Sequence, residues 1–227
     1  MTKFICMSDT HSRHEQMIVP PGDVILHAGD FSMMGRVAEV QPFLDWLAAL
    51  PHKHKVLICG NHDWLGEKDP ALMEQMCKDR GIIYLNDSGA TVEGFKVWGS
   101  PVQPWFCNWA FNRIRGEEIN KHWVLIPEDT DILLTHGPPH KILDRVWNSW
   151  NIADNRPNKK RGCRYTGCEM LAKRIEIVKP QLHVCGHIHC DRGIKIKDGI
   201  TYANAAIVDE SYTVAHKCIE VNLYESS

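Results

Sequence analysis

Side chains of the kinds that bind metal ions follow five short apolar runs of this sequence. The runs lie at residues 4–7, 24–28, 56–59, 132–135 and 182–185. The residues that follow them are Asp9, His11, Asp30, Asn61, His62, His136, His187 and His189. Carboxylates, an amide and imidazoles that met at one edge would repel one another or be poorly solvated without cations. The pattern therefore predicts a metal site.

The donor types indicate which ions such a site would take. Asp30 offers two oxygens, which is the simplest way for a protein to bridge two ions. Asn61 adds an amide oxygen, and the histidines add nitrogens. A mixed oxygen and nitrogen set suits Mn, Fe, Zn, Co or Ni better than Ca or Mg. Two such ions, about 3.5–4 Å apart, can activate a water and clamp the oxygens of a phosphoryl group.

The elements that must position these residues read as alternating strands and helices. Apolar runs of this length, bounded by glycine or polar residues, are typical of buried strands, and ligands bind where such strands end in an α/β sheet. Helical spacing predicts helices over 36–50 and 70–80, and a capping-box pattern from Thr166 to Glu169 begins a third over 166–178. Further strands are expected at 181–185, 193–197, 200–205 and 212–221. We therefore expect an α/β fold.

The distribution of the polar residues indicates one domain over residues 1–227, because the parts before and after about residue 130 both contribute to the site. Two segments, 100–114 and 138–165, look irregular and are longer than ordinary connections. Long loops in a compact domain are commonly functional or mobile.

Composition narrows the possible partners and compartment. The 26 basic and 28 acidic residues give a net charge of −2, so no global field attracts nucleic acid or an anionic membrane. We expect neither a signal peptide nor a membrane span. The nine cysteines are an odd number, and Cys6, Cys59 and Cys185 lie inside apolar runs. This usage favours a reducing, cytoplasmic environment over a disulfide framework.

The ordered polar set resembles the calcineurin-like metallophosphoesterase superfamily, whose pattern is D-x-H, G-D, G-N-H-[DE], H and G-H-x-H. The match extends from Asp9 to His189 and fills every ligand position. The stretches 8–13, 135–139 and 202–206 resemble a branch of small phosphodiesterases that cleave cyclic nucleotides and model diesters. The resemblance implies a β-sandwich of two mixed sheets flanked by helices, with a dimetal site at the C-terminal ends of the strands.

The same resemblance implies roles for individual residues. One ion would be held by Asp9, His11, Asp30 and His189, and the second by Asp30, Asn61, His136 and His187. A metal-bridged hydroxide would attack the phosphorus, and His62 would act as the general acid. Manganese is the ion that we favour. Asp63 either orients the His62 ring or supports a metal ligand.

Four further residues are candidates for substrate contacts. Arg13 and His14 follow the first ligand pair and could bind a phosphate oxygen. Trp105 and Phe106 lie in an aromatic stretch, 104–111, which is either a hydrophobic flap or a wall on which a nucleobase stacks. The same two alternatives, a hydrophobic flap or a stacking wall, apply to Trp147 and Trp150. The basic run 158–164 is either a solvated loop or an attractor of phosphorylated substrate.

Other readings of the sequence remain open at this stage. The leading hypothesis is a phosphodiesterase that acts on small nucleotides, and the enzymatic alternatives are a nuclease or a phosphomonoesterase. A non-catalytic scaffold is disfavoured because no ligand position is missing. A Cys₄ zinc site is an alternative use of four cysteines, Cys163, Cys168, Cys185 and Cys190. His27 and His183 are expected in the core, bonded to backbone; His52, His54, His122, His140 and His216 are expected at the surface or in loops.

Overall fold

A computed structural model describes residues 1–147, 150–151, 156–157 and 163–224. Its first sheet has five strands in the order β17-β1-β2-β3-β4. These strands span Ile219–Leu223, Thr2–Met7, Val24–His27, His54–Leu57 and Ile83–Tyr84. The strands β1 to β4 run parallel, and β17 pairs antiparallel with β1.

The second sheet has six strands in the order β15-β16-β14-β9-β6-β5. They span Gly193–Lys197, Ile200–Asn204, Leu182–Cys185, Ile132–Thr135, Phe95–Ser100 and Ser88–Val92. The four central strands are parallel, and each edge strand is antiparallel to its neighbour. Both sheets are therefore mixed, as expected.

The two sheets pack face to face, and the alternating direction of successive side chains along each strand explains why. In β1, Phe4 and Cys6 point into the core between the sheets, whereas Ile5 and Met7 point to the opposite face. All four side chains are fully buried. A strand that is apolar on both faces must be covered on both, and helices supply the second cover.

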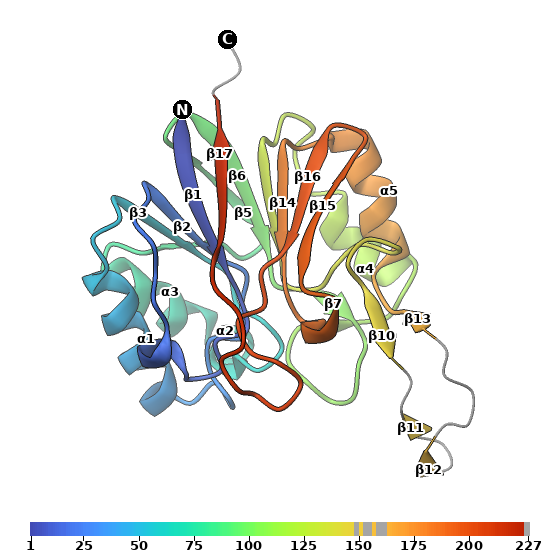
Figure 1. The fold of residues 1–227 in the computed structure, drawn as a ribbon, viewed down its shortest axis with the longest axis horizontal. Coiled ribbons are helices and arrows are strands. Elements are labelled where there is room, and N and C mark those ends of the chain that lie inside the picture. Colours follow the sequence, from blue (N-terminus) through green and yellow to red (C-terminus); the bar gives the residue numbers. More distant parts are fainter. Residues whose placement is uncertain (148–149, 152–155, 158–162, 225–227) are drawn as a thin grey trace.

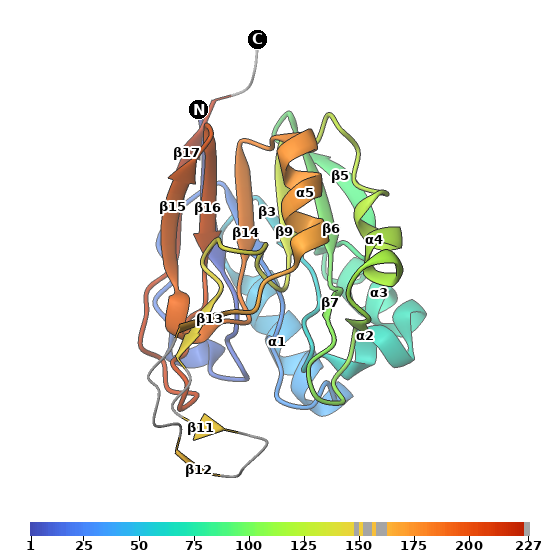
Figure 2. The same cartoon turned by 90° about the vertical axis from the view of Figure 1, so that its right-hand side faces the viewer.

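Helices flank the sandwich on its two outer faces (Figures 1 and 2). Three cover the first sheet: α1 (Val37–Ala49), α2 (Trp64–Lys68) and α3 (Pro70–Lys78). Two cover the second sheet: α4 (Glu117–Trp123) and α5 (Glu169–Val178). Among the residues described, no helix is long and apolar enough to cross a membrane. The predicted β-sandwich flanked by helices is confirmed.

Several predicted boundaries were wrong. The third helix begins at Glu169, not at Thr166, because the Thr166 hydroxyl donates to the carbonyl of Asp144 (3.2 Å) instead of capping a helix. The strand expected over 212–221 is limited to β17, since residues 212–218 bend across the end of the sandwich. The helices α2 and α4 were not predicted, because five and seven residues are too few to show a helical period.

The two segments expected to be irregular contain short strand pairs. In the first, β7 (Gln103–Pro104) pairs with β8 (Asn112–Arg113). In the second, β10 (Arg145–Trp147) pairs with β13 (Cys163–Tyr165), and β11 (Trp150–Asn151) pairs with β12 (Arg156–Pro157). Most of the basic run, residues 158–162, lies outside the described residues.

Candidate metal centre

The candidate ligands follow the carboxyl ends of five parallel strands. Asp9 and His11 follow β1, Asp30 follows β2, Asn61 and His62 follow β3, His136 follows β9, and His187 and His189 follow β14. These strand ends lie at the end of the sandwich opposite to the two termini (Figure 1). The site therefore draws on both sheets.

The backbone at this end adopts conformations that ordinary residues avoid. Asp9, His11, Asp30 and His187 all have positive φ, between 40° and 67°. A non-glycine residue in the left-handed region costs free energy, and such residues concentrate at functional sites. The turns thus aim these side chains inward at the expense of backbone strain.

Asp30 lies at the middle of the cluster. Its Oδ2 is 3.3 Å from Nε2 of His136 and 3.8 Å from Nε2 of His11. Its Oδ1 accepts a hydrogen bond from the backbone N–H of His62 (2.7 Å). Nε2 of His136 also lies 3.0 Å from Oδ1 of Asn61.

A second group of contacts surrounds Asp9. Nε2 of His189 lies 3.3 Å from Oδ1 of Asp9, and Nε2 of His11 lies 3.9 Å from the same oxygen. The carboxylate also accepts the backbone N–H of His187 (3.0 Å). Asp9 is fully buried, so the two clusters together place two carboxylates in one desolvated space.

Three overlapping trios bring ligand atoms within 4.8 Å of one another. They are Asp9, His11 and His189; His11, Asp30 and His62; and Asp30, His136 and His187. Asp30 belongs to two of them, and so does His11. The structure thus brings all seven side chains that the sequence singled out as ligands into one cluster.

The ring orientations fit metal binding. Nδ1 of His136 lies 2.9 Å from the carbonyl of Ala28, and Nδ1 of His189 lies 3.0 Å from the carbonyl of Asp209. A carbonyl can only accept, so each Nδ1 carries a proton and each Nε2 is left to face the carboxylates. Metal-binding histidines are commonly fixed in this way.

His11 gives an independent test of that fit. Its side chain is 1% exposed, yet neither ring nitrogen has a hydrogen-bond partner among the described residues. Buried polar atoms are almost always paired. A divalent ion between His11 and the two aspartates would satisfy the ring, so the residues present fit the metal.

Two glycines allow the loops to approach the carboxylates closely. A Cβ on Gly60 would lie 2.3 Å from Oδ1 of Asp30, and one on Gly186 would lie 2.1 Å from Oδ2 of Asp9. Neither glycine needs a left-handed backbone. Their role is therefore to leave space for the ligands.

Without metal, protons take the place of the cations. Burial alone would raise the pKa of Asp9, but the hydrogen bond from His189 and the nearby imidazoles lower it to about 2. Burial alone would lower the pKa of His136 and His189, but the buried aspartates raise both to about 9. Metal binding must displace these protons.

His62 lies at the edge of the cluster and faces a cavity. It is 7% exposed, and its Nδ1 lies 2.7 Å from the carbonyl of Met33, so Nδ1 carries a proton and Nε2 is left free. The Trp109 indole stacks on its ring at 4.1 Å between centroids. Tyr212 adds edge contacts to both His62 and His11.

Asp63 does not orient the His62 ring, since Met33 does. Instead its carboxylate accepts the backbone N–H groups of Asp30 (2.8 Å), Ser32 (3.0 Å) and Gly60 (2.8 Å). Burial and the charge of Asp30 raise its pKa to about 7. Asp63 therefore supports the metal ligands by joining the loops after β2 and β3.

A cavity of about 460 Å³ opens above the cluster. Trp105 and Phe106 line it and are 58% and 50% exposed, so the aromatic stretch is not simply packed on the sheet. Trp109 and Tyr212 line it too. Trp109 could have been found from the sequence, because it lies inside the aromatic stretch. Nothing in the sequence marks Tyr212, which lies in a segment expected to be a strand.

Other candidates for substrate contact lie elsewhere. Arg13 is exposed and does not line the cavity. His14 is buried against Phe43 and Trp46, beneath α1, which removes it from the substrate path. Trp147 is exposed but does not line the cavity, and the side chain of Trp150 lies outside the described residues.

The alternative Cys₄ zinc site is contradicted. Within the part of the chain that the structure describes, no group with metal-ligand spacing contains a cysteine. Cys168 lies in the core and accepts the Trp123 indole N–H (3.2 Å), and Cys190 bonds to the carbonyl of Arg145. Cys185 is buried in β14.

The remaining histidines largely follow expectation. His27 is buried and accepts the backbone N–H of Gly29 (3.2 Å). His183 is buried as well, but it bonds to the Thr135 hydroxyl (2.8 Å) rather than to backbone. His52 lies in a loop, as expected, but is buried, and it contacts the carbonyl of Pro20 (2.9 Å).

Comparison with known proteins gives the family. The model of the calcineurin-like phosphoesterase family matches residues 2–191. Human metallophosphoesterase domain-containing protein 1 is 37% identical over 246 residues, which cover 98% of this chain and 71% of that protein. A UPF0046 protein of Caenorhabditis elegans is 33% identical and covers 90% of this chain and 69% of its own length.

Solved structures agree on the fold. The phosphopantetheinyl hydrolase of Mycobacterium tuberculosis superposes with a TM-score of 0.58 at 14% identity, over 92% of this chain and 90% of that one. Identity this low supports the fold alone. Taken with the match over residues 2–191, it leaves one conclusion: the chain belongs to the calcineurin-like phosphoesterase family of metal-dependent phosphoester hydrolases.

Proposed function

We propose that this protein is a two-metal phosphodiesterase that hydrolyses small nucleotide diesters, including cyclic nucleotides. The observation that carries the proposal is the position of Asp30, whose Oδ2 lies 3.8 Å from Nε2 of His11 and 3.3 Å from Nε2 of His136. His62 lies beside this carboxylate and lines the cavity. The first ion would be held by Asp9, His11, Asp30 and His189. The second would be held by Asp30, Asn61, His136 and His187.

When bound, two divalent ions supply the Lewis acidity that activates water and neutralises charge on the phosphoryl oxygens. Manganese is the ion we favour, because the ligand set mixes oxygen with nitrogen donors. The carbonyls of Ala28 and Asp209 orient two of these ligands, His136 and His189.

His62 supplies the proton in this proposal. Its Nδ1–H donates to the carbonyl of Met33, which holds the ring in place. A proton on Nε2 then faces the cavity and can pass to the departing oxygen. General acid catalysis of this kind contributes on the order of 10²–10⁴ in rate.

The cavity favours a small substrate. Its volume of about 460 Å³ lies within the range of sites for small molecules, about 300–1,000 Å³. The exposed rings of Trp105 and Phe106 offer surfaces on which a base can stack. A net charge of −2 disfavours an extended nucleic acid, whose phosphates must each meet a cation.

The test is hydrolysis of bis-p-nitrophenyl phosphate by protein reconstituted with Mn²⁺, with Fe, Co, Ni and Zn as alternatives. His62→Ala should keep its metal content and lose about 10²–10⁴ in kcat. Asp30→Asn should lose metal. Inactivity with all five metals would end the proposal, and loss of metal from His62→Ala would make His62 a ligand instead.

A panel of three substrates separates the enzymatic alternatives. We expect a 2′,3′-cyclic nucleotide to be cleaved faster than single-stranded DNA or a nucleoside monophosphate. Preference for DNA would indicate a nuclease, and preference for the monophosphate would indicate a phosphomonoesterase.

A further inference from the structure

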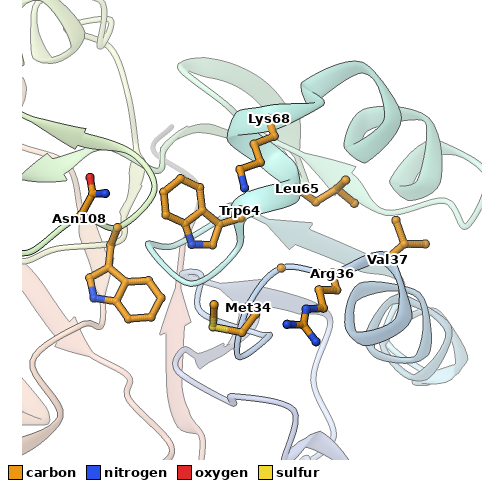
Figure 3. Close-up of a pocket in the computed structure, with 9 residues that line it drawn as sticks. Met34, Arg36, Val37, Trp64, Leu65, Lys68 and Asn108 are labelled. Carbon is orange, nitrogen blue, oxygen red and sulfur yellow. The ribbon is translucent and has the colours of Figure 1, made fainter.

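A second groove lies beside the metal cavity and shares one wall with it. The groove has a volume of about 760 Å³ and lies between the start of α1 and the helix α2. Trp109 lines both hollows, so its indole is the partition between them. Figure 3 shows Trp64, Lys68 and Arg36 around this groove.

The groove carries positive charge. Arg36 and Lys68 line it, and no carboxylate is among its lining residues. Two nearby acidic residues are engaged away from the lining: Glu67 pairs with Arg113, and Asp69 accepts the backbone N–H of Leu72. Glu39 lies nearer, because it accepts the backbone N–H of Met34, which lines the groove. The lining itself is cationic in a chain whose net charge is −2, which favours an anion there.

The groove also offers aromatic surface. Trp64 is half-buried, and the Lys68 ammonium lies 4.7 Å from the centroid of its ring. His62 covers one face of the Trp109 indole, which leaves the other face and the ring edges for the groove. Nucleobases stack on aromatic rings of this kind.

The groove is built from the residues that hold the proton donor. The Trp64 backbone N–H donates to the carbonyl of His62 (3.0 Å). Met34 follows Met33, whose carbonyl accepts the His62 ring proton. A general acid must be close to the departing oxygen, so a group that leaves on the His62 side would lie beside Trp109, which also lines this groove.

We propose that the groove binds the leaving group of a linear phosphodiester, and that this leaving group is a nucleotide with an aromatic base and a further phosphate. The inference rests on the proposed function. Water adds its oxygen to the phosphorus and releases a proton to solvent, the bond from phosphorus to the leaving oxygen breaks, and that oxygen takes the proton from His62, which solvent then restores. The base contacts Trp64 and Trp109, and the further phosphate contacts Arg36 and Lys68.

The test uses metal-reconstituted protein and the double variant Arg36→Gln/Lys68→Gln. Both side chains are exposed, so the substitution should not impair folding. We expect kcat/KM for 5′-phosphoadenylyl-(3′→5′)-adenosine, relative to kcat/KM for bis-p-nitrophenyl phosphate, to fall about 10-fold. The ratio for adenylyl-(3′→5′)-adenosine, which lacks the further phosphate, should fall less than 3-fold.

A matched control removes two exposed lysines from other helices. Lys78→Gln/Lys121→Gln makes the same change in net charge on α3 and α4 and should leave the ratio unchanged. An equal fall of the ratio in the control would overturn the proposal, because the effect would then reflect overall charge. No fall of the ratio in the Arg36→Gln/Lys68→Gln variant would overturn it as well.

A binding measurement separates this inference from the proposed function. Quenching of tryptophan fluorescence by 5′-AMP should give a Kd that weakens about 10-fold in Arg36→Gln/Lys68→Gln and is unchanged in the control. If the wild-type protein hydrolysed none of these three diesters, the proposed function would fail, and this titration would still decide whether the groove binds a nucleotide. An unchanged Kd would exclude that binding.

Discussion

Substitution of Gly60 by alanine should displace the carboxylate that the two ions are proposed to share. The new Cβ would lie 2.3 Å from Oδ1 of Asp30, 2.5 Å from its backbone nitrogen and 2.6 Å from Cε1 of His136. Ordinary contacts of this kind begin at 3.4 Å. The neighbours must therefore retreat by roughly 1 Å, and because one of them is backbone, side-chain rotation cannot relieve the clash.

The magnitude follows from that displacement. Overpacking of a buried site costs about 1–3 kcal/mol, and a misplacement of about 1 Å in a catalytic group can cost about 10²-fold in rate. Because Asp30 is proposed to hold both ions, Gly60→Ala should weaken the binding of both together. We expect about 100-fold lower kcat with bis-p-nitrophenyl phosphate and less than two equivalents of bound metal.

Gly186→Ala makes a parallel change with a different expected result. Its Cβ would lie 2.1 Å from Oδ2 of Asp9 and 2.2 Å from Oγ of Ser8. Asp9 is proposed to hold only the first ion. The second ion should therefore remain, and the variant should bind one equivalent of metal.

Gly137→Ala is the matched control, because it lies next to His136 but its Cβ would meet only Cβ of Gln103, at 3.6 Å. Metal content by mass spectrometry and affinity by calorimetry with Mn²⁺ are the measurements. If Gly60→Ala bound two equivalents with wild-type affinity, the shared carboxylate would not hold the ions. If Gly186→Ala lost both ions, the assignment of Asp9 to one ion would be wrong.

Two predictions concern pH. Burial alone would lower the pKa of His136 and His189, but the buried aspartates raise both to about 9 in the metal-free chain. Each ion therefore displaces one proton, and Mn²⁺ affinity should rise about 10-fold per pH unit up to pH 9. Calorimetry in two buffers measures the protons released, and a pH-independent affinity would contradict the prediction. Burial lowers the pKa of His183 to about 3, so the unfolded chain binds the proton first and the free energy of unfolding falls as pH drops below 6.5, by about 2 kcal/mol at pH 5. Urea unfolding of metal-free protein should show this loss of stability, and His183→Gln should lose about 2 kcal/mol less. Equal losses in the two proteins would refute the assignment.

The sequence predicts the frame of the fold well, because the frame depends on local patterns. Short apolar runs ended by glycine or polar residues locate β1, β2, β9 and β14. Because successive side chains point to opposite faces, such a run is apolar on both faces and both must be covered. Parallel strands place their carboxyl ends together, which is why residues as distant as Asp9 and His187 meet. Their role as ligands remains a prediction that metal analysis must test.

What the sequence could not predict depends on contacts between distant segments. Nothing local marks Tyr212 as a neighbour of His11 and His62, since the expected strand over 212–221 would have carried it into a sheet. The role of Asp63 was equally hidden, because its partners are backbone groups of loops that approach only in the fold. His14 was misleading for the converse reason: proximity in sequence to His11 did not keep it near the site.

The segment from Asn61 to Lys68 explains how the metal cavity and the second groove can act together. It begins with a candidate ligand, continues with the proposed proton donor His62 and with Asp63, and ends in the helix whose Trp64 and Lys68 line the groove. Asp63 binds backbone N–H groups on both sides of this junction, so the distance between Asp30 and His62 is set by hydrogen bonds rather than by side-chain packing. A leaving group held by α2 would therefore be held in a fixed position relative to the atom that protonates it, which is the condition for efficient proton transfer.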